Sequence, residues 1–274
     1  MLIKVFKNFL FASTNWFVLM GCSGNAFHDI ASSSPDDSYL YEAKADINLF
    51  NYTSAIQILT TKVSAASQAK SNFKETLAVA YAGQCGLNFA NFINGLAVSV
   101  SGTAFGLMMT PFVGVATTPA SCLAALNIME SLGTTATRAA NQNAFVAVVG
   151  MALMGTQTRS SVDKSPVNGD GAVDTPICTL PNSEIDNIIL GFGFMSKNFS
   201  YLSTQQLGAS SQGSINGAIT GCQSVAGASC SITDPALITT PIRDTMRDLL
   251  NTSDYGVGPV ASGGNPVLIS GACP

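Results

Sequence analysis

Six cysteines beyond residue 22 carry the clearest chemistry in this chain. In an exported protein an even number of cysteines indicates disulfides, although the count alone does not fix the connectivity, and buried free thiols are the alternative. We expect one bridge across a short Gly- and Ser-rich loop. A second could join two helical hairpins, and a third could tie the C-terminal tail to the middle of the chain. In that order, the predicted pairs are Cys222 with Cys230, Cys85 with Cys122, and Cys178 with Cys273.

A second group of residues with possible chemistry is the run Asn168-Gly169-Asp170-Gly171-Ala172-Val173-Asp174. Alternating oxygen ligands around a sharp glycine turn suit Ca²⁺, and the run resembles the centre of a calcium loop of the EF-hand or dockerin kind. The resemblance implies Asn168, Asp170 and Asp174 as ligands. The first and twelfth loop positions fall on Pro166 and Ile177, so both anchoring carboxylates are missing. A solvated turn is therefore the alternative.

The remaining polar residues offer no catalytic constellation. His28 is the only histidine and lies in a small, polar N-terminal segment, so the rest of the chain has no Ser–His or Cys–His pair and few options for zinc. Phosphate-binding and dinucleotide-binding glycine motifs are absent. The pair Glu42 and Asp46, and the charges of 243–248, have the spacing of solvated helix faces. We therefore expect no enzymatic activity and no cofactor beyond the calcium candidate.

The first 22 residues have the order of a secretory signal. Lys4 and Lys7 precede an apolar run that ends at Met20, and a small residue stands before Cys22. The string Leu19-Met20-Gly21-Cys22 resembles the lipobox of bacterial lipoproteins, which implies removal of residues 1–21 and a lipid on the Cys22 thiol. By the same resemblance, Ser23 implies sorting to the outer membrane. An ordinary cleaved signal or a signal anchor is the alternative, although the apolar run is shorter than the about 20 residues of a comfortable span.

The composition of the remaining chain limits its partners. Without Lys4 and Lys7, the 12 basic residues become 10, against 16 acidic residues. This balance disfavours nucleic acid, whose binding needs clustered Lys and Arg. Only 10% of the residues are charged, against roughly a quarter in typical proteins. Such an uncharged surface fits a protein that is held at a membrane or against a partner.

Helical periodicity organises the beginning of the body. Ser34 can cap a helix that starts at Pro35, and a second helix is expected from Tyr52 to Val63, so that the two form an antiparallel hairpin. The string Phe50-Asn51-Tyr52-Thr53-Ser54-Ala55-Ile56 resembles the turn into the second helix of a tetratricopeptide repeat. Residues 73–96 are expected to form the first helix of another hairpin. The repeat period is not sustained, so the resemblance implies a stack of hairpins that is only tetratricopeptide-like.

No charged residue occurs between Thr76 and Met129. Within this stretch, residues 93–115 are long enough to raise the question of a membrane span. Pro111 and the many Gly, Ser and Thr residues favour a buried segment between helices instead. A groove that faces a partner or lipid is the functional form of the same observation, because exposed apolar patches usually mark binding sites.

The rest of the chain is predicted from helix start and stop signals. Further helices are expected over 119–141, over 143–155, from a cap at Ser183, and over 242–251, with a loop over 208–213. No stretch alternates clearly enough for a sheet. The predicted organisation is a signal peptide (1–21), a flexible tether (22–34), an N-terminal helical hairpin region (35–155), a linker loop (156–181), and a C-terminal helical region with a coil tail (182–274).

Together these observations predict an all-α, disulfide-braced, tetratricopeptide-like body on a lipid anchor. The expected function is a scaffold that binds a protein partner, or an apolar ligand, on the periplasmic side of the bacterial outer membrane. The alternative is a membrane-inserting or pore-associated subunit that uses the uncharged stretch 76–129.

Overall fold

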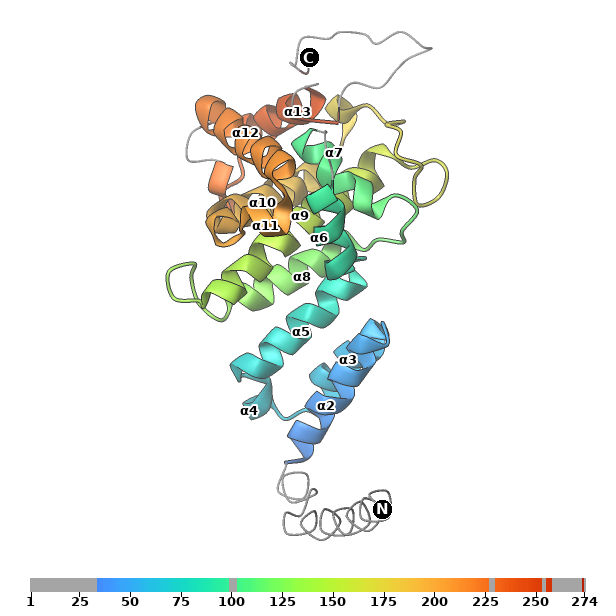
Figure 1. Cartoon of the computed structure of the whole chain (residues 1–274), viewed down its shortest axis with the longest axis vertical. Coiled ribbons are helices and arrows are strands. Elements are labelled where there is room, and N and C mark those ends of the chain that lie inside the picture. Colours follow the sequence, from blue (N-terminus) through green and yellow to red (C-terminus); the bar gives the residue numbers. More distant parts are fainter. Residues whose placement is uncertain (1–33, 99–102, 227–229, 253–254, 258–272, 274) are drawn as a thin grey trace, which may run out of the picture.

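The computed structural model describes residues 34–98, 103–226, 230–252, 255–257 and 273. All regular structure within these ranges is helical, as the sequence predicts. Figure 1 shows the first helices at one end of the molecule, with α5 leading from them into a larger helical body. The longer helices are α2 (Pro35–Asn48), α3 (Tyr52–Gln57), α5 (Ser71–Gln84), α6 (Phe89–Val98), α7 (Ala104–Met109), α8 (Pro119–Glu130), α9 (Ala140–Val162), α10 (Asn182–Asn198), α12 (Ala209–Ala226) and α13 (Thr240–Asn251). The shorter elements are η1 (Ile58–Lys62), α4 (Ala65–Gln68), η2 (Thr110–Phe112), η3 (Ile177–Thr179), η4 (Phe199–Tyr201), α11 (Thr204–Leu207) and η6 (Pro235–Leu237).

The first helix begins where the sequence predicts. The Ser34 hydroxyl accepts the Asp37 N–H at 3.2 Å, and the Asp37 carboxylate accepts the Ser34 N–H at 3.3 Å. This reciprocal capping box satisfies two backbone donors at the start of α2. The chain turns at Phe50 and continues as α3 and η1, which pack against α2. The predicted first pair of helices is therefore present.

Buried apolar side chains form two clusters, and α5 contributes to both. The smaller cluster lies between α2, α3, η1 and α5 and contains Phe73 and Ala80 of α5. The larger cluster contains Ala78 and Ala82 of the same helix and extends as far as α13. Because a helix turns about 100° per residue, these positions fall on different faces. Helix α5 thus connects the small N-terminal layer to the main body.

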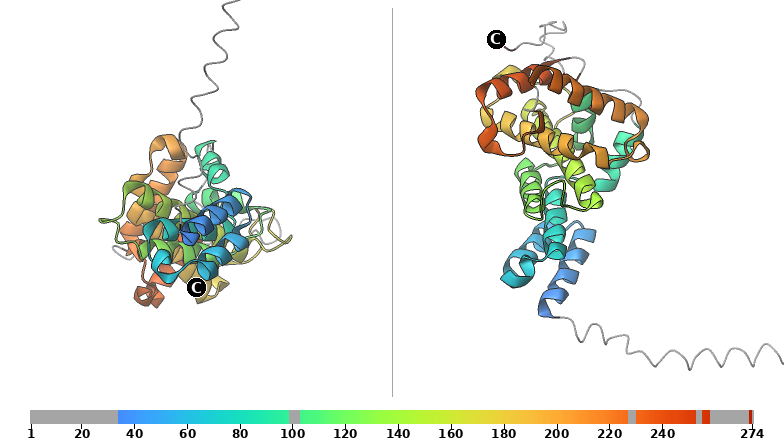
Figure 2. Two further views of the ribbon diagram at one scale, coloured as in Figure 1. Left: turned by 90° about the horizontal axis from the view of Figure 1, so that it is seen from below. Right: turned by 90° about the vertical axis from the view of Figure 1, so that its left-hand side faces the viewer.

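Helix α9 lies at the centre of the larger cluster. It packs along α10 and also against α7 and α8, and it is buried on nearly all sides from Val146 to Val162. The right view of Figure 2 shows α12 and α13 (orange and red) at the end of the molecule opposite the first helices (blue). The sequence predicts that the helix ends at Gly155, because polar residues follow. In the structure these residues stay inside the helix and find partners there.

The first residues of the predicted linker over 156–181 are helical and form the end of α9. Three polar contacts explain why they remain in the helix. The Thr156 hydroxyl donates to the Ala152 carbonyl at 2.7 Å. The Gln157 amide donates to the Ser161 hydroxyl at 2.9 Å and accepts from Asn187 of α10 at 2.9 Å. Buried polar groups with satisfied hydrogen bonds are compatible with a core. The two regions on either side of the predicted linker therefore share one core, formed along α9 and α10.

Glycines allow the helices around α9 to approach closely. A Cβ on Gly150 would lie 2.8 Å from the Gly191 carbonyl oxygen, and a Cβ on Gly191 would lie 2.8 Å from the Gly150 carbonyl oxygen. The α9–α10 crossing therefore brings backbone against backbone. At Gly155 a Cβ would overlap the carbonyl of Met108 in α7. These glycines are required by packing, because the nearest atoms belong to the backbone and cannot rotate away.

Some helix boundaries differ from the predicted ones. The helix expected over 73–96 is divided into α5 and α6, because Gly86 adopts a φ of 107° that ends the first helix. The helix expected over 119–141 ends at Glu130. Helix α10 starts one residue before Ser183, with Pro181 at the cap position, so Ser183 is not the cap.

The loop expected over 208–213 reduces to one residue. Gly208 has a φ of 76° and separates α11 from α12, and the five residues after it are helical. The final helix over 240–251 agrees with the prediction. Most of the tail after residue 252 lies outside the described residues.

The uncharged stretch 76–129 contributes to the core of the main body. Phe92, Phe105, Met108 and Phe112 are each at most 1% exposed. Phe92 and Phe112 contact each other with ring centroids 5.6 Å apart. None of the helices in the described part of the chain is long and apolar enough to cross a membrane.

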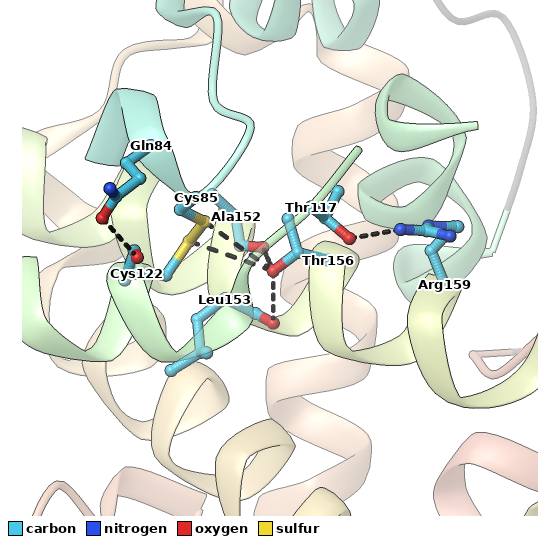
Figure 3. The surroundings of a disulfide bond; sticks show 9 residues. Gln84, Cys85, Thr117, Cys122, Ala152, Leu153, Thr156 and Arg159 are labelled. Atoms are coloured by element: carbon cyan, nitrogen blue, oxygen red, sulfur yellow. Dashed lines mark hydrogen bonds between the residues drawn. A yellow bond between two sulfur atoms is a disulfide. The ribbon is translucent and has the colours of Figure 1, made fainter. Parts of the chain in front are cut away.

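Three disulfides brace the fold, and their pairings coincide with the predicted ones. The Cα–Cα distances are 5.2 Å for Cys85–Cys122, 5.3 Å for Cys178–Cys273 and 5.9 Å for Cys222–Cys230. The first joins the end of α5 to α8 directly above α9, where the Thr156 hydroxyl lies 3.8 and 3.9 Å from the two sulfurs (Figure 3).

Candidate functional site

An apolar groove lies where α2, α5, α6 and α9 meet. Two adjoining pockets form it, with volumes of about 520 and 620 Å³. Val79, Phe89 and Phe145 line both pockets and form the wall between them. We call these two pockets the Phe89 groove. Their sizes are within the range of ligand sites in proteins.

Local sequence signals place Phe89 at this wall. Gly86 ends the region of α5 with its positive φ, and a Cβ there would lie 3.2 Å from the Ala116 carbonyl oxygen. Asn88 then caps α6 by accepting the Asn91 N–H at 3.1 Å. Phe89 is consequently the first residue of a new helix and not part of the buried stripe of α5. Its side chain is 47% exposed.

Exposed apolar side chains gather at the Phe89 groove. Large hydrophobic residues with high exposure are few in the described residues, and four of them line the two pockets. Scattered exposed hydrophobics are ordinary, whereas contiguous ones with a polar border mark binding surfaces. The four residues are Phe50, Val79, Phe89 and Tyr201.

The border of the groove is formed mainly by carboxamides. Glu75 is the one charged side chain among the described residues that line the two pockets. Its carboxylate accepts the Gln142 amide at 2.7 Å, and the Gln142 oxygen accepts the Ala139 N–H at 2.8 Å at the start of α9. Tyr52 lines the pocket that Glu75 does not line, and burial raises the pKa of the Tyr52 hydroxyl above its ordinary value. The carboxamides are those of Asn48, Asn88, Asn91, Asn141, Gln142 and Gln206.

Phe50 stands at one end of the groove in a strained conformation. Its φ of 62° lies in the left-handed region, which bulky side chains rarely adopt. The ring is 65% exposed and makes a T-shaped contact with the ring of Tyr52, at a centroid distance of 6.2 Å. A strained and exposed aromatic ring contributes little to the core, so it is a candidate for contact with a ligand.

We expect Phe50→Asn to raise the free energy of unfolding by about 1 kcal/mol, because Asn tolerates a positive φ at lower cost. Chemical denaturation followed by circular dichroism measures this change. Phe50→Ala is the matched control: it removes the same ring but retains a side chain that disfavours the left-handed region. Equal stability of the two variants would contradict the assignment of strain to this position.

The carboxylates of the calcium candidate accept hydrogen bonds from backbone N–H groups of their own loop. Asp170 accepts the Ala172 N–H at 2.9 Å, and Asp174 accepts the N–H groups of Lys164 and Ser165. The buried Asp163 carboxylate accepts the N–H groups of Asp170 and Gly171 at 3.0 and 2.9 Å. Within the described residues no three acidic, His or Cys side chains gather as a metal site would require.

The same loop has its own structural explanation. Asn168 and Gly169 both have positive φ values, of 74° and 79°, and form a tight turn over Asp163. Desolvation is the largest single influence on the pKa of Asp174 and acts to raise it. The hydrogen bonds from the backbone N–H groups of Lys164 and Ser165, with smaller contributions from Thr175 and Lys164, outweigh it, so the pKa is lowered from its ordinary value. The carboxylate oxygens of Asp170 and Asp174 that suggested calcium ligation therefore hold the loop's own backbone.

Three charged residues of the last helix contact neighbouring elements, whereas Asp244 is 60% exposed and pairs with Arg247 at 3.2 Å, as the prediction of a solvated face has it. Arg243 donates two hydrogen bonds to Asp186 of α10, at 2.6 and 3.0 Å, which raises the pKa of Arg243 further. Arg247 donates to the Leu180 carbonyl at 3.0 Å, and Asp248 accepts the Cys273 N–H at 2.7 Å. These side chains fasten α13 to its neighbours.

Cys22, the predicted lipidation site, lies outside the described residues. Of the carboxylate pair Glu42 and Asp46, Glu42 lies 3.5 Å from the ammonium of Lys62. Comparison of the chain with known protein families, with curated proteins and with solved structures finds no match.

Proposed function

We propose that this chain is an exported lipoprotein whose helical body binds a protein partner at the bacterial cell envelope. The Phe89 groove is the observation that carries the binding role, because it is a continuous apolar surface with a polar border. The lipid anchor rests on the lipobox-like residues 19–22. By resemblance to lipoprotein sorting, Ser23 supports the outer membrane as the location, and we propose its periplasmic side.

One further feature of the described residues supports this proposal. The three disulfides suit an oxidising compartment outside the cytosol. A tetratricopeptide-like stacking of helical hairpins is the finer form of the fold that we propose, with α2 and α3 as one hairpin and α5 as the first helix of the next. Stacked hairpins of this kind leave an extended surface for a partner.

A photoreactive phenylalanine derivative at position 89 tests the binding role in the native envelope. We expect a discrete crosslinked product from position 89, and none from the same derivative at position 237. Leu237 is also exposed, at 59%, but lines neither pocket. The product should decrease at least fivefold when Val79→Asp is introduced into the same chain, because a charge would then stand in the apolar wall that the partner must cover.

Three results would count against the proposal. They are equal crosslinking from positions 89 and 237, insensitivity to Val79→Asp, and a mature N-terminus that begins elsewhere than at a lipidated Cys22. A Cys22→Ser chain that still floats with liposomes would instead favour the alternative, a subunit that inserts the stretch 76–129 into the membrane.

A further inference from the structure

We infer that the Phe89 groove takes a polypeptide segment that carries two large apolar side chains and, beside them, a Lys or Arg. This inference rests on the proposed function, since it specifies the chemistry of the partner at the same groove.

The number of apolar side chains follows from the shape of the groove. Val79, Phe89 and Phe145 line both pockets, so a chain that lies across them passes over one shared wall. One side chain can enter the pocket on each side of that wall. Each pocket alone is within the range of volumes that hold ligands, and a single side chain would leave the other pocket empty.

The carboxamide border favours a polypeptide over a lipid. Each residue of a bound chain presents an N–H donor and a carbonyl acceptor, and a carboxamide offers both functions in return. The side chains of Asn48, Asn91 and Asn141 make no hydrogen bond to any other described residue. They lie around both pockets and remain available to the backbone of an occupant. An acyl chain has no polar group that could use them.

Charge complementarity selects the basic residue. Glu75 is half-buried and is bonded to the neutral Gln142, and no Lys or Arg is present among the described residues that line the two pockets. Lys44 lines a neighbouring pocket together with Glu75, but the described residues show no ion pair between them. Inside the two pockets, a lipid phosphate, a fatty acid or an acidic peptide would therefore meet this carboxylate with no Lys or Arg in the same lining to neutralise it. A Lys or Arg of the occupant would pair with Glu75 in a partly desolvated position, where an ion pair is stronger than at an open surface.

The inference is tested by panning a phage-displayed library of random 12-residue peptides against the whole mature chain. The phage that elute are counted separately for the parent protein and for each variant. We expect the enriched peptides to carry two large apolar residues and at least one Lys or Arg. Their synthetic forms should bind Phe89→Ser at least tenfold more weakly than the parent protein. Leu237→Ser is the matched control and should bind as the parent does, because it also exchanges an exposed apolar residue for Ser.

A double-mutant cycle then isolates the charge. Glu75→Gln should weaken a Lys-bearing peptide at least fivefold, and should leave the same peptide with Gln in place of Lys unchanged. Glu75→Gln keeps an acceptor for Gln142, and circular dichroism melting should show that the variant folds. Three results would overturn the inference. The library could enrich acidic peptides, it could show no enrichment relative to Phe89→Ser, or the effects of the Lys and Glu75 changes could be independent of each other. Displacement of bound peptide by dodecanoate at equal concentration would also overturn it.

Failure here is distinguishable from failure of the proposed function. If position 89 crosslinks to an envelope protein in cells while the library yields acidic or groove-independent peptides, the groove still binds a partner, and only its chemistry is wrong. If position 89 gives no specific crosslink, the proposed function fails regardless of the peptides.

Discussion

Gly155→Ala should lower the free energy of unfolding by about 3 kcal/mol, the upper part of the range for overpacked cores. The added Cβ would overlap the Met108 carbonyl and would lie 2.8 Å from the Phe112 ring. A flexible side chain could rotate away, but a carbonyl cannot, so α7 as a whole would have to move away from α9. Urea denaturation followed by circular dichroism gives the change.

Gly213→Ala is the matched control for this prediction. Gly213 also lies inside a helix, α12, and a Cβ there would have no neighbour within 4 Å. We expect this variant to be more stable by about 0.5–1 kcal/mol, because Ala has the higher helix propensity. The same substitution should therefore have opposite signs at the two sites. Equal effects would mean that helix propensity, and not the α7–α9 contact, governs position 155.

Replacing Cys178 and Cys273 together by Ser should remove about 4–5 kcal/mol of stability. The bridge joins residues 95 positions apart, and the entropy lost by the unfolded chain increases with the length of the closed loop. The same double replacement at Cys222 and Cys230, which are 8 apart, should remove only about 2.5 kcal/mol. Both pairs are measured by denaturant unfolding of the oxidised chain.

The ranking of these two pairs is the decisive result. If the loss is equal for both pairs, or larger for Cys222 and Cys230, local native contacts must outweigh the restriction of the unfolded chain. The donor of the hydrogen bond to Asp248 is the backbone N–H of residue 273, which Cys273→Ser retains. This single variant therefore tests whether the hydrogen bond survives without the bridge.

Local signals predict much of this fold. Ser34, Pro35 and Asp37 mark the start of α2 without reference to any distant residue, and the final helix is equally legible from Thr240 and Pro241. The central helix is not predictable in this way. Thr156 and Gln157 are typical of loops, and only the partners that α9 and α10 provide make them acceptable in a core. The length of α9 is therefore decided by tertiary contacts.

The candidate site was harder to predict than the fold. Phe89 continues the spacing of Tyr81 and Cys85, so the periodicity alone assigns it to a buried stripe. Gly86 followed by Asn88 is a stop signal and a start signal, and this pair could have revealed the break. The groove itself joins residues of distant segments, such as Val79 and Phe145, and no local pattern connects them. The calcium candidate shows the converse, because its Asp and Asn pattern describes equally well a loop that binds its own backbone.

The bridge between Cys178 and Cys273 closes the final third of the chain into a covalent ring, and the bridge between Cys222 and Cys230 closes a smaller ring inside it. A single cut by a protease anywhere within the larger ring opens it without releasing a fragment. Helices α10 to α13 would then remain attached to the body that carries the Phe89 groove, and α10 would continue to support α9. In a compartment that contains proteases, helices α10 to α13 would therefore stay attached to the groove after one cut within the ring.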